Sequence, residues 1–176
     1  MPYFSLDTPR SATLVYNSDR VNPRPFVHVE VTPDTGYTPT EYRLQVKVNG
    51  AFVTFVNGDQ TLRFAYPGRT KVRLGGQFDA SGYTTGVYPL DILVSAYDAG
   101  SQSSITTSLA TKLVVVNETS SAIAAGWTLG GIQMLYLQSD SSALVTEGDG
   151  NAVYFTKVGA SWVSPAGDFS LFGRSV

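Results

Sequence analysis

Residues 42–56, YRLQVKVNGAFVTFV, determine the fold class of this chain. Apolar and polar side chains alternate as far as Val48, and the Asn49-Gly50 pair that follows is a strong signal for a two-residue type I′ hairpin turn. Such a turn pairs position 48 with 51, 46 with 53 and 44 with 55. That register places four large apolar residues on the core face: Leu44, Val46, Val53 and Phe55. We expect Phe52 on the opposite, solvent-facing side.

Similar alternation recurs on both sides of the hairpin. Turn signals such as Asn22-Pro23 and Pro67-Gly68 separate these stretches. Further strands are predicted at 12–16, 26–32, 62–66, 72–78, 86–97 and 105–116. Seven or eight short strands in about a hundred residues are typical of two antiparallel sheets packed as a sandwich.

The strand predicted at 86–97 begins with Gly86-Val87-Tyr88. A tyrosine in this position resembles the tyrosine corner of immunoglobulin-like sandwiches, whose hydroxyl bonds to the backbone of the preceding turn. We therefore expect Tyr88 to be structural. The sequence predicts that residues 1–117 form an immunoglobulin- or fibronectin-III-like β-sandwich.

Beyond the polar stretch 117–121, glycines recur at fixed places in three short segments. The segments are AGWTLGGI (125–132), LVTEGDGN (144–151) and SPAGDF (164–169). Glycines among bulky residues suit strands that turn sharply and bring backbones close together. Strands are predicted at 132–137, 143–146, 152–157 and 161–164, with one helical turn at 122–125.

Residues 118–176 should thus form a small, strand-rich unit of hairpins. A unit of about 60 residues buries too little of its surface to be stable without support. We expect it to dock on the sandwich, with Trp127 and Trp162 as its buried apolar anchors.

Composition excludes several classes of function. Charged residues are 15% of the 176, the net charge is −2 and the pI is near 5.2, so no basic surface for nucleic acid is indicated. Cysteine is absent, which excludes disulfides and thiolate metal sites. The longest apolar run, Leu113–Val116, is far too short to span a membrane, and Met1-Pro2-Tyr3-Phe4 is unlike a signal peptide. We expect no cofactor.

Few side chains suggest a chemical site. His28 is the single histidine and sits opposite Val27 and Val29 in an alternating strand, so we expect no catalytic role and no enzyme. Glu147, Asp149 and Asn151 alternate around two glycines, a set of oxygen ligands that suits calcium but equally an ordinary hairpin turn.

Loop tyrosines offer a different kind of site. Tyr37, Tyr83 and Tyr97 follow turn-rich segments or end a strand, where an aromatic face can stack on a sugar ring or meet a protein partner. The alternative is that these three side chains simply pack against the sandwich.

The glycine-containing segments together resemble the part of bacterial Rhs/YD-repeat proteins that leads into their tandem repeats. The matching pieces are Gly126-Trp127-Thr128-Leu129 with Gly131, then 144–150, Phe155 and 163–169. Members of that family are large, secreted or cell-surface proteins whose repeats form a β-shell, often around a toxin.

This chain has neither tandem Tyr-Asp repeats nor a toxin domain. The resemblance therefore implies only a non-catalytic structural module whose main partner is the rest of its own polypeptide. The alternative is a carbohydrate-binding or adhesion module with a glycan or protein partner.

Overall fold

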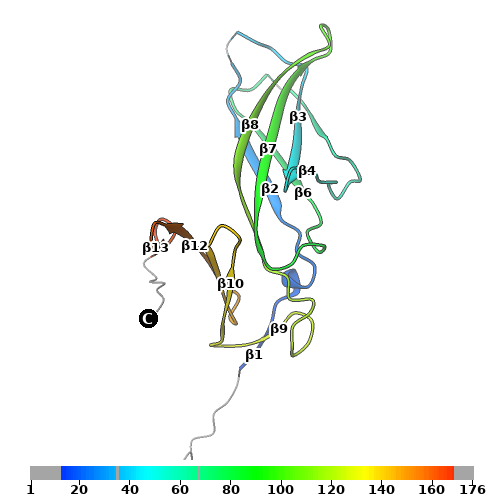
Figure 1. The fold of residues 1–176 in the computed structure, drawn as a ribbon. Coiled ribbons are helices and arrows are strands. Elements are labelled where there is room, and N and C mark those ends of the chain that lie inside the picture. Colours follow the sequence, from blue (N-terminus) through cyan, green and yellow to red (C-terminus); the bar gives the residue numbers. More distant parts are fainter. Residues whose placement is uncertain (1–12, 35, 67, 169–176) are drawn as a thin grey trace, which may run out of the picture. The chain divides into compact units, whose positions relative to one another are not determined.

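A computed structural model describes residues 13–34, 36–66 and 68–168 of the chain (Figure 1). The described residues form antiparallel sheets, and their one helical element is the short 3-10 helix η1 (Ser18–Arg20). The all-β prediction is therefore confirmed. The helical turn expected at 122–125 is wrong, because the chain bends there and Ala124 forms an isolated bridge with Trp127.

The chain divides into two compact units. One is Asn22–Asn117, which we call the sandwich. The other combines the residues on both sides of it, and we call its described part, 13–21 with 118–168, the hairpin unit. The predicted boundary after Asn117 coincides with this division, whereas the residues up to Val21 lie outside the sandwich.

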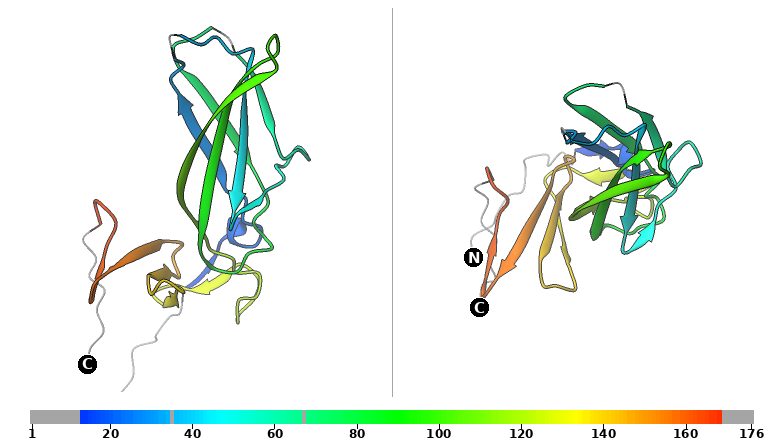
Figure 2. Two further views of the ribbon diagram at one scale, coloured as in Figure 1. Left: turned by 45° about the horizontal axis from the view of Figure 1, so that its top comes forward. Right: turned by 90° about the horizontal axis from the view of Figure 1, so that it is seen from above.

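The described residues of the sandwich form seven strands in two sheets (Figures 1 and 2). The larger sheet has the order β4-β3-β7-β8, with β5 also paired to β3, and the smaller sheet is β2-β6. Their bounds are β2 (Phe26–Val31), β3 (Glu41–Val48), β4 (Ala51–Phe52), β5 (Leu62–Ala65), β6 (Val72–Gln77), β7 (Gly86–Asp98) and β8 (Ser103–Val115). This order is that of an immunoglobulin-like sandwich in which β2 and β6 are the B and E strands.

Side chains from both sheets meet in one core. Every second residue of β3 is buried, as the alternation predicts, including Leu44 and Val46. Leu74 of β6 and Ile92 of β7 contribute to the same cluster, as does Phe78 just after β6. The two sheets therefore cover each other's apolar faces.

The 42–56 hairpin has the predicted turn. Asn49 and Gly50 have φ of 52° and 78°, and Val48 pairs with Ala51. Burial follows the prediction too, since Phe55 is 2% exposed and Phe52 is 41% exposed.

The hairpin's far end differs from the expected 44–55 pairing. Strand β4 ends at Phe52, and Phe55 forms a bridge with Phe78, next to β6. Leu44 pairs instead with Leu62 and Val94 of its own sheet. The chain crosses between the sheets here, so Phe55 stays in the core without continuing the ladder.

Tyr88 makes the expected corner. Its hydroxyl donates a hydrogen bond to the carbonyl oxygen of Thr84 at 2.7 Å. The bond ties the start of β7 to the preceding turn, as the resemblance to immunoglobulin-like sandwiches implies.

The hairpin unit contains a two-stranded ribbon, β1 (Leu14–Tyr16) with β9 (Trp127–Leu129), and a four-stranded sheet. The sheet has the order β10 (Gln133–Leu137), β11 (Ala143–Glu147), β12 (Ala152–Val158) and β13 (Ser161–Val163). These four strands confirm the predicted ones to within a residue or two.

The strand predicted at 12–16 exists but belongs to the hairpin unit, not to the sandwich. Its backbone pairs with β9, and the rings of Tyr16 and Trp127 lie 5.3 Å apart. Alternation predicts a strand but does not specify its partner, which explains the wrong assignment.

The two tryptophans are not the buried anchors that we expected. Trp127 is 37% exposed, and in the two-stranded ribbon its ring contacts that of the cross-strand neighbour Tyr16. Trp162 is half-buried, and its indole N–H donates to the carbonyl of Ser141 at 3.0 Å. The most buried apolar side chains of this unit are instead Ala143, Leu144 and Phe155.

Candidate functional site

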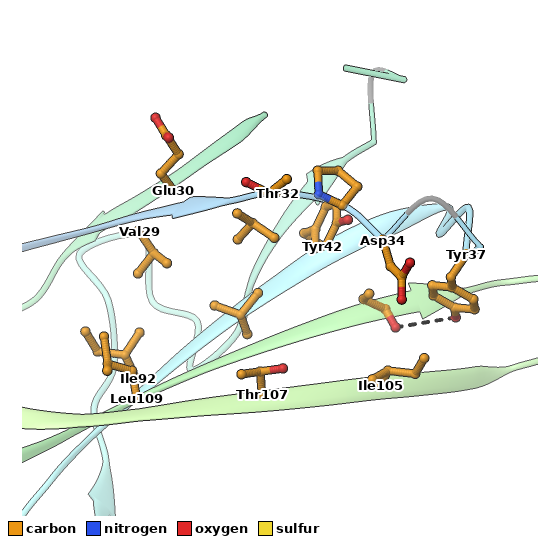
Figure 3. A pocket seen from close by; sticks show the side chains of 14 residues that line it. Val29, Glu30, Thr32, Asp34, Tyr37, Tyr42, Ile92, Ile105, Thr107 and Leu109 are labelled. Carbon is orange, nitrogen blue, oxygen red and sulfur yellow. Dashed lines mark hydrogen bonds between the residues drawn. The ribbon is translucent and has the colours of Figure 1, made fainter. Parts of the chain in front are cut away.

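An open groove runs between β2 and β8 of the sandwich, as Figure 3 shows. Its volume of about 430 Å³ is in the range of small ligand-binding sites. Most lining side chains are apolar and come from both sheets: Val29, Val31, Tyr42, Ile92, Val94, Ala96, Ile105 and Leu109. The groove therefore exposes part of the sandwich interior.

The groove exists because both bordering strands are sheet edges. Among the described residues, β2 pairs only with β6 and β8 only with β7. Alternation along β8 places Ile105, Thr107 and Leu109 on the groove side, and Ile105 and Leu109 are 59% and 58% exposed. Edge strands usually carry charges that prevent pairing, but none of these three residues is charged.

One end of the groove is polar and acidic. Tyr37 donates a hydrogen bond to the carbonyl oxygen of Ala96 at 3.5 Å, and Asp34 lies beside it (Figure 3). The Asp34 carboxylate accepts a hydrogen bond from the backbone N–H of Gly36 at 3.2 Å and forms no ion pair with a described residue.

Glu30, the other acidic residue at the groove, points away from it (Figure 3). Its carboxylate accepts hydrogen bonds from Lys71 at 2.7 Å and Arg73 at 3.4 Å. These two cations hold the pKa of Glu30 below its ordinary value. Asp34 is thus the carboxylate available to a ligand in the groove.

The three tyrosines proposed for sugar binding lie in different surroundings. Tyr37 lines the groove, whereas the guanidinium carbon of Arg43 lies 3.5 Å from the ring centroid of Tyr97. The ring of Tyr83 packs 5.0 Å from that of Tyr88 and against the core. The structure does not bring the three together as one stacking surface.

The residues considered for calcium have protein hydrogen-bond partners. Glu147 accepts a bond from the Gln133 amide at 2.8 Å, and Asp149 accepts two from Asn151, each at 3.1 Å. Gly150 donates to the carbonyl of Glu147 and closes the turn between β11 and β12. Within the part of the chain that the structure describes, no cluster of three or more His, Cys, Asp or Glu side chains could hold a metal.

His28 is exposed on the face of β2 opposite the buried Val27. It pairs with Gly75 of β6, and it is not among the residues that line the groove. Its position agrees with the surface location that alternation predicts.

A second notable site lies where the chain leaves and rejoins the hairpin unit. The Arg20 guanidinium and the Glu118 carboxylate form an ion pair, with Nη1 2.5 Å from Oε1, and both side chains are buried. The backbone N–H of Glu118 also donates a hydrogen bond to the carbonyl oxygen of Arg20 at 2.8 Å. Similarly, the backbone N–H of Asn17 donates to the carbonyl oxygen of Gly126 at 2.9 Å.

Sequence reasoning missed both the groove and this ion pair. A signal for the groove was present, since residues 103–111 are rich in Ser and Thr and contain no charge. The ion pair left no such signal, because its two residues are separated by the whole sandwich.

Comparisons with protein-family models, with curated proteins and with solved structures found no match. In the described ranges, no helix has the length and hydrophobicity required to cross a membrane.

Proposed function

We propose that this chain is a non-catalytic structural module of a larger secreted or cell-surface polypeptide, similar to the part of Rhs/YD-repeat proteins that precedes their repeats. In this proposal, the hairpin unit connects to the rest of the polypeptide and holds the sandwich. The sandwich is the part presented to partners.

The observation that carries the proposal is the insertion of the sandwich between two paired segments of the hairpin unit. Strands β1 and β9 pair across the insertion, and the Arg20–Glu118 ion pair holds its two ends together. A domain attached through two adjacent strands can be presented without interrupting the unit that carries it.

The resemblance to Rhs/YD-repeat proteins supports the proposal, because glycines in the matching segments are needed for backbone packing. A Cβ on Gly148 would lie 1.9 Å from the carbonyl oxygen of Leu129, and Gly126 has φ of +76°. These motif positions thus serve the fold, as expected for a scaffold segment.

Antibody labelling tests this proposal in the organism of origin. An antibody raised against the sandwich should label intact, unpermeabilised cells or the culture medium. Labelling only after permeabilisation would contradict it. In the same cells, a Gly148→Ala chain should lose this labelling through misfolding, while Gly82→Ala should keep it, because a Cβ on Gly82 meets nothing within 4 Å.

A further inference from the structure

We infer that the groove between β2 and β8 is an acceptor site for an extended peptide strand of a partner protein, which adds to the edge of β8. The strand would carry aliphatic side chains at alternate positions and a Lys or Arg at the end that reaches Asp34.

Backbone chemistry is the first argument for a strand. Among the described residues, the stretch of β8 that lines the groove pairs only with β7, so its other side presents N–H and C=O groups. An extended peptide satisfies such a row of donors and acceptors residue by residue.

Side-chain chemistry is the second argument. A strand beside β8 points every second residue into the space between the sheets. The walls there are aliphatic, with Val29 and Val31 on one sheet and Ile92 and Val94 on the other. Aliphatic residues at alternate positions fit those walls and would cover the exposed Ile105 and Leu109.

Position in the fold is the third argument. In immunoglobulin-like sandwiches the A strand lies beside the B strand, which here is β2. The strand predicted at 12–16 as the first of the sandwich pairs with β9 instead, so no described strand lies along this edge of β2. A peptide added at β8 would close the same side of the sandwich.

Charge indicates the polarity of the ligand. No Lys or Arg is among the described residues that line the groove, and Asp34 at its end forms no ion pair with any of the described residues. A basic residue on the bound strand complements this carboxylate. A nucleic acid or other polyanion does not fit this arrangement.

Selection of displayed random peptides on the immobilised full chain tests the inference, with peptides of about ten residues to match a typical strand. Enriched sequences should alternate aliphatic and polar residues and carry Lys or Arg near one end. Addition of a selected synthetic peptide should slow amide hydrogen exchange in Ser103–Leu109, and a proline at its centre should abolish binding.

Matched variants locate the site. Leu109→Lys places a charge in the groove and should lower peptide affinity by at least about tenfold. Ser108→Lys lies on the opposite face of the same strand and should leave affinity unchanged. Asp34→Asn should weaken a Lys-containing peptide more than its Gln counterpart. Both β8 positions are exposed, and unchanged thermal unfolding verifies that the variants fold.

Three kinds of outcome would overturn the inference. One is the absence of any enriched alternating sequence, or equal binding by Leu109→Lys and Ser108→Lys. Another is concentration-dependent dimerisation of the full chain that Leu109→Lys abolishes, which would make a second copy the occupant. The third is glycan-array binding that Tyr37→Ala removes, without slowed exchange in β8.

Discussion

Arg20 and Glu118, 98 positions apart in the sequence, form a buried ion pair with Nη1 and Oε1 at 2.5 Å. Their side chains are only 7% and 9% exposed. The pair joins the segment that precedes the sandwich to the segment that follows it.

Removal of one partner should be costly, because the other charge then stays buried without compensation. Glu118→Leu or Arg20→Met alone should lower the free energy of unfolding by about 3–5 kcal/mol. The double variant should recover much of that loss. Urea unfolding of the unsubstituted chain, the two single variants and the double variant measures the coupling energy between Arg20 and Glu118. Additive losses of stability would show that the pair does not act as a unit.

Phe55 and Phe52 provide a matched test of the hairpin. Phe55→Ala should cost about 3–5 kcal/mol, because the side chain is in the core at 2% exposure. Phe52→Ala, at 41% exposure, should cost much less. Chemical denaturation distinguishes the two. Equal losses would contradict the burial of Phe55 in the core and the exposure of Phe52.

The hydroxyl of Tyr88 should contribute measurable stability through its bond to Thr84. Tyr88→Phe is expected to lose about 1 kcal/mol. Tyr83→Phe is the control, since Tyr83 belongs to the same ring pair and its hydroxyl has no hydrogen-bond partner among the described residues. A melting temperature equal to that of the unsubstituted chain for Tyr88→Phe would contradict this role.

Asp98 should make the β7–β8 turn sensitive to acid. Hydrogen bonds from the Ser101 hydroxyl, at 2.6 Å, and from the Gly100 N–H hold its pKa below the ordinary value. A lowered folded-state pKa adds stability above the unfolded pKa, about 3.9, and this stability disappears as the pH falls through the folded value.

Asp98→Asn should therefore melt at a lower temperature than the unsubstituted chain at neutral pH. The difference should shrink as the pH is lowered to about 2, because the Asp98 carboxylate then takes up its proton and loses its charge. A gap of equal size at both pH values would assign the effect to packing instead of charge.

Local patterns determine what the sequence can predict. Alternation and the Asn49-Gly50 turn identify the strands of the sandwich and the face that is buried. The Gly-x-Tyr start of β7 identifies the Tyr88 corner. Each of these features depends on residues close together in the chain.

Non-local pairing accounts for the errors. The segment that contains Leu14 and Tyr16 has a strand pattern, but its pairing with Trp127 depends on residues more than a hundred positions away. With this choice of partner, no described strand lies along the edge of β2 that borders the groove. Asp34 and Leu109 show no pattern of a site until the topology places them along the same groove.

The most direct test of the inserted architecture compares two chains without the sandwich. One is residues 118–176 alone, and the other joins 1–21 to 118–176 through a short Gly-Ser linker. Because both tryptophans lie in this part, their fluorescence follows its unfolding in urea. The account predicts a cooperative transition for the joined chain and none for 118–176, which lacks β1 and Arg20. An equally sharp transition in 118–176 alone would contradict it.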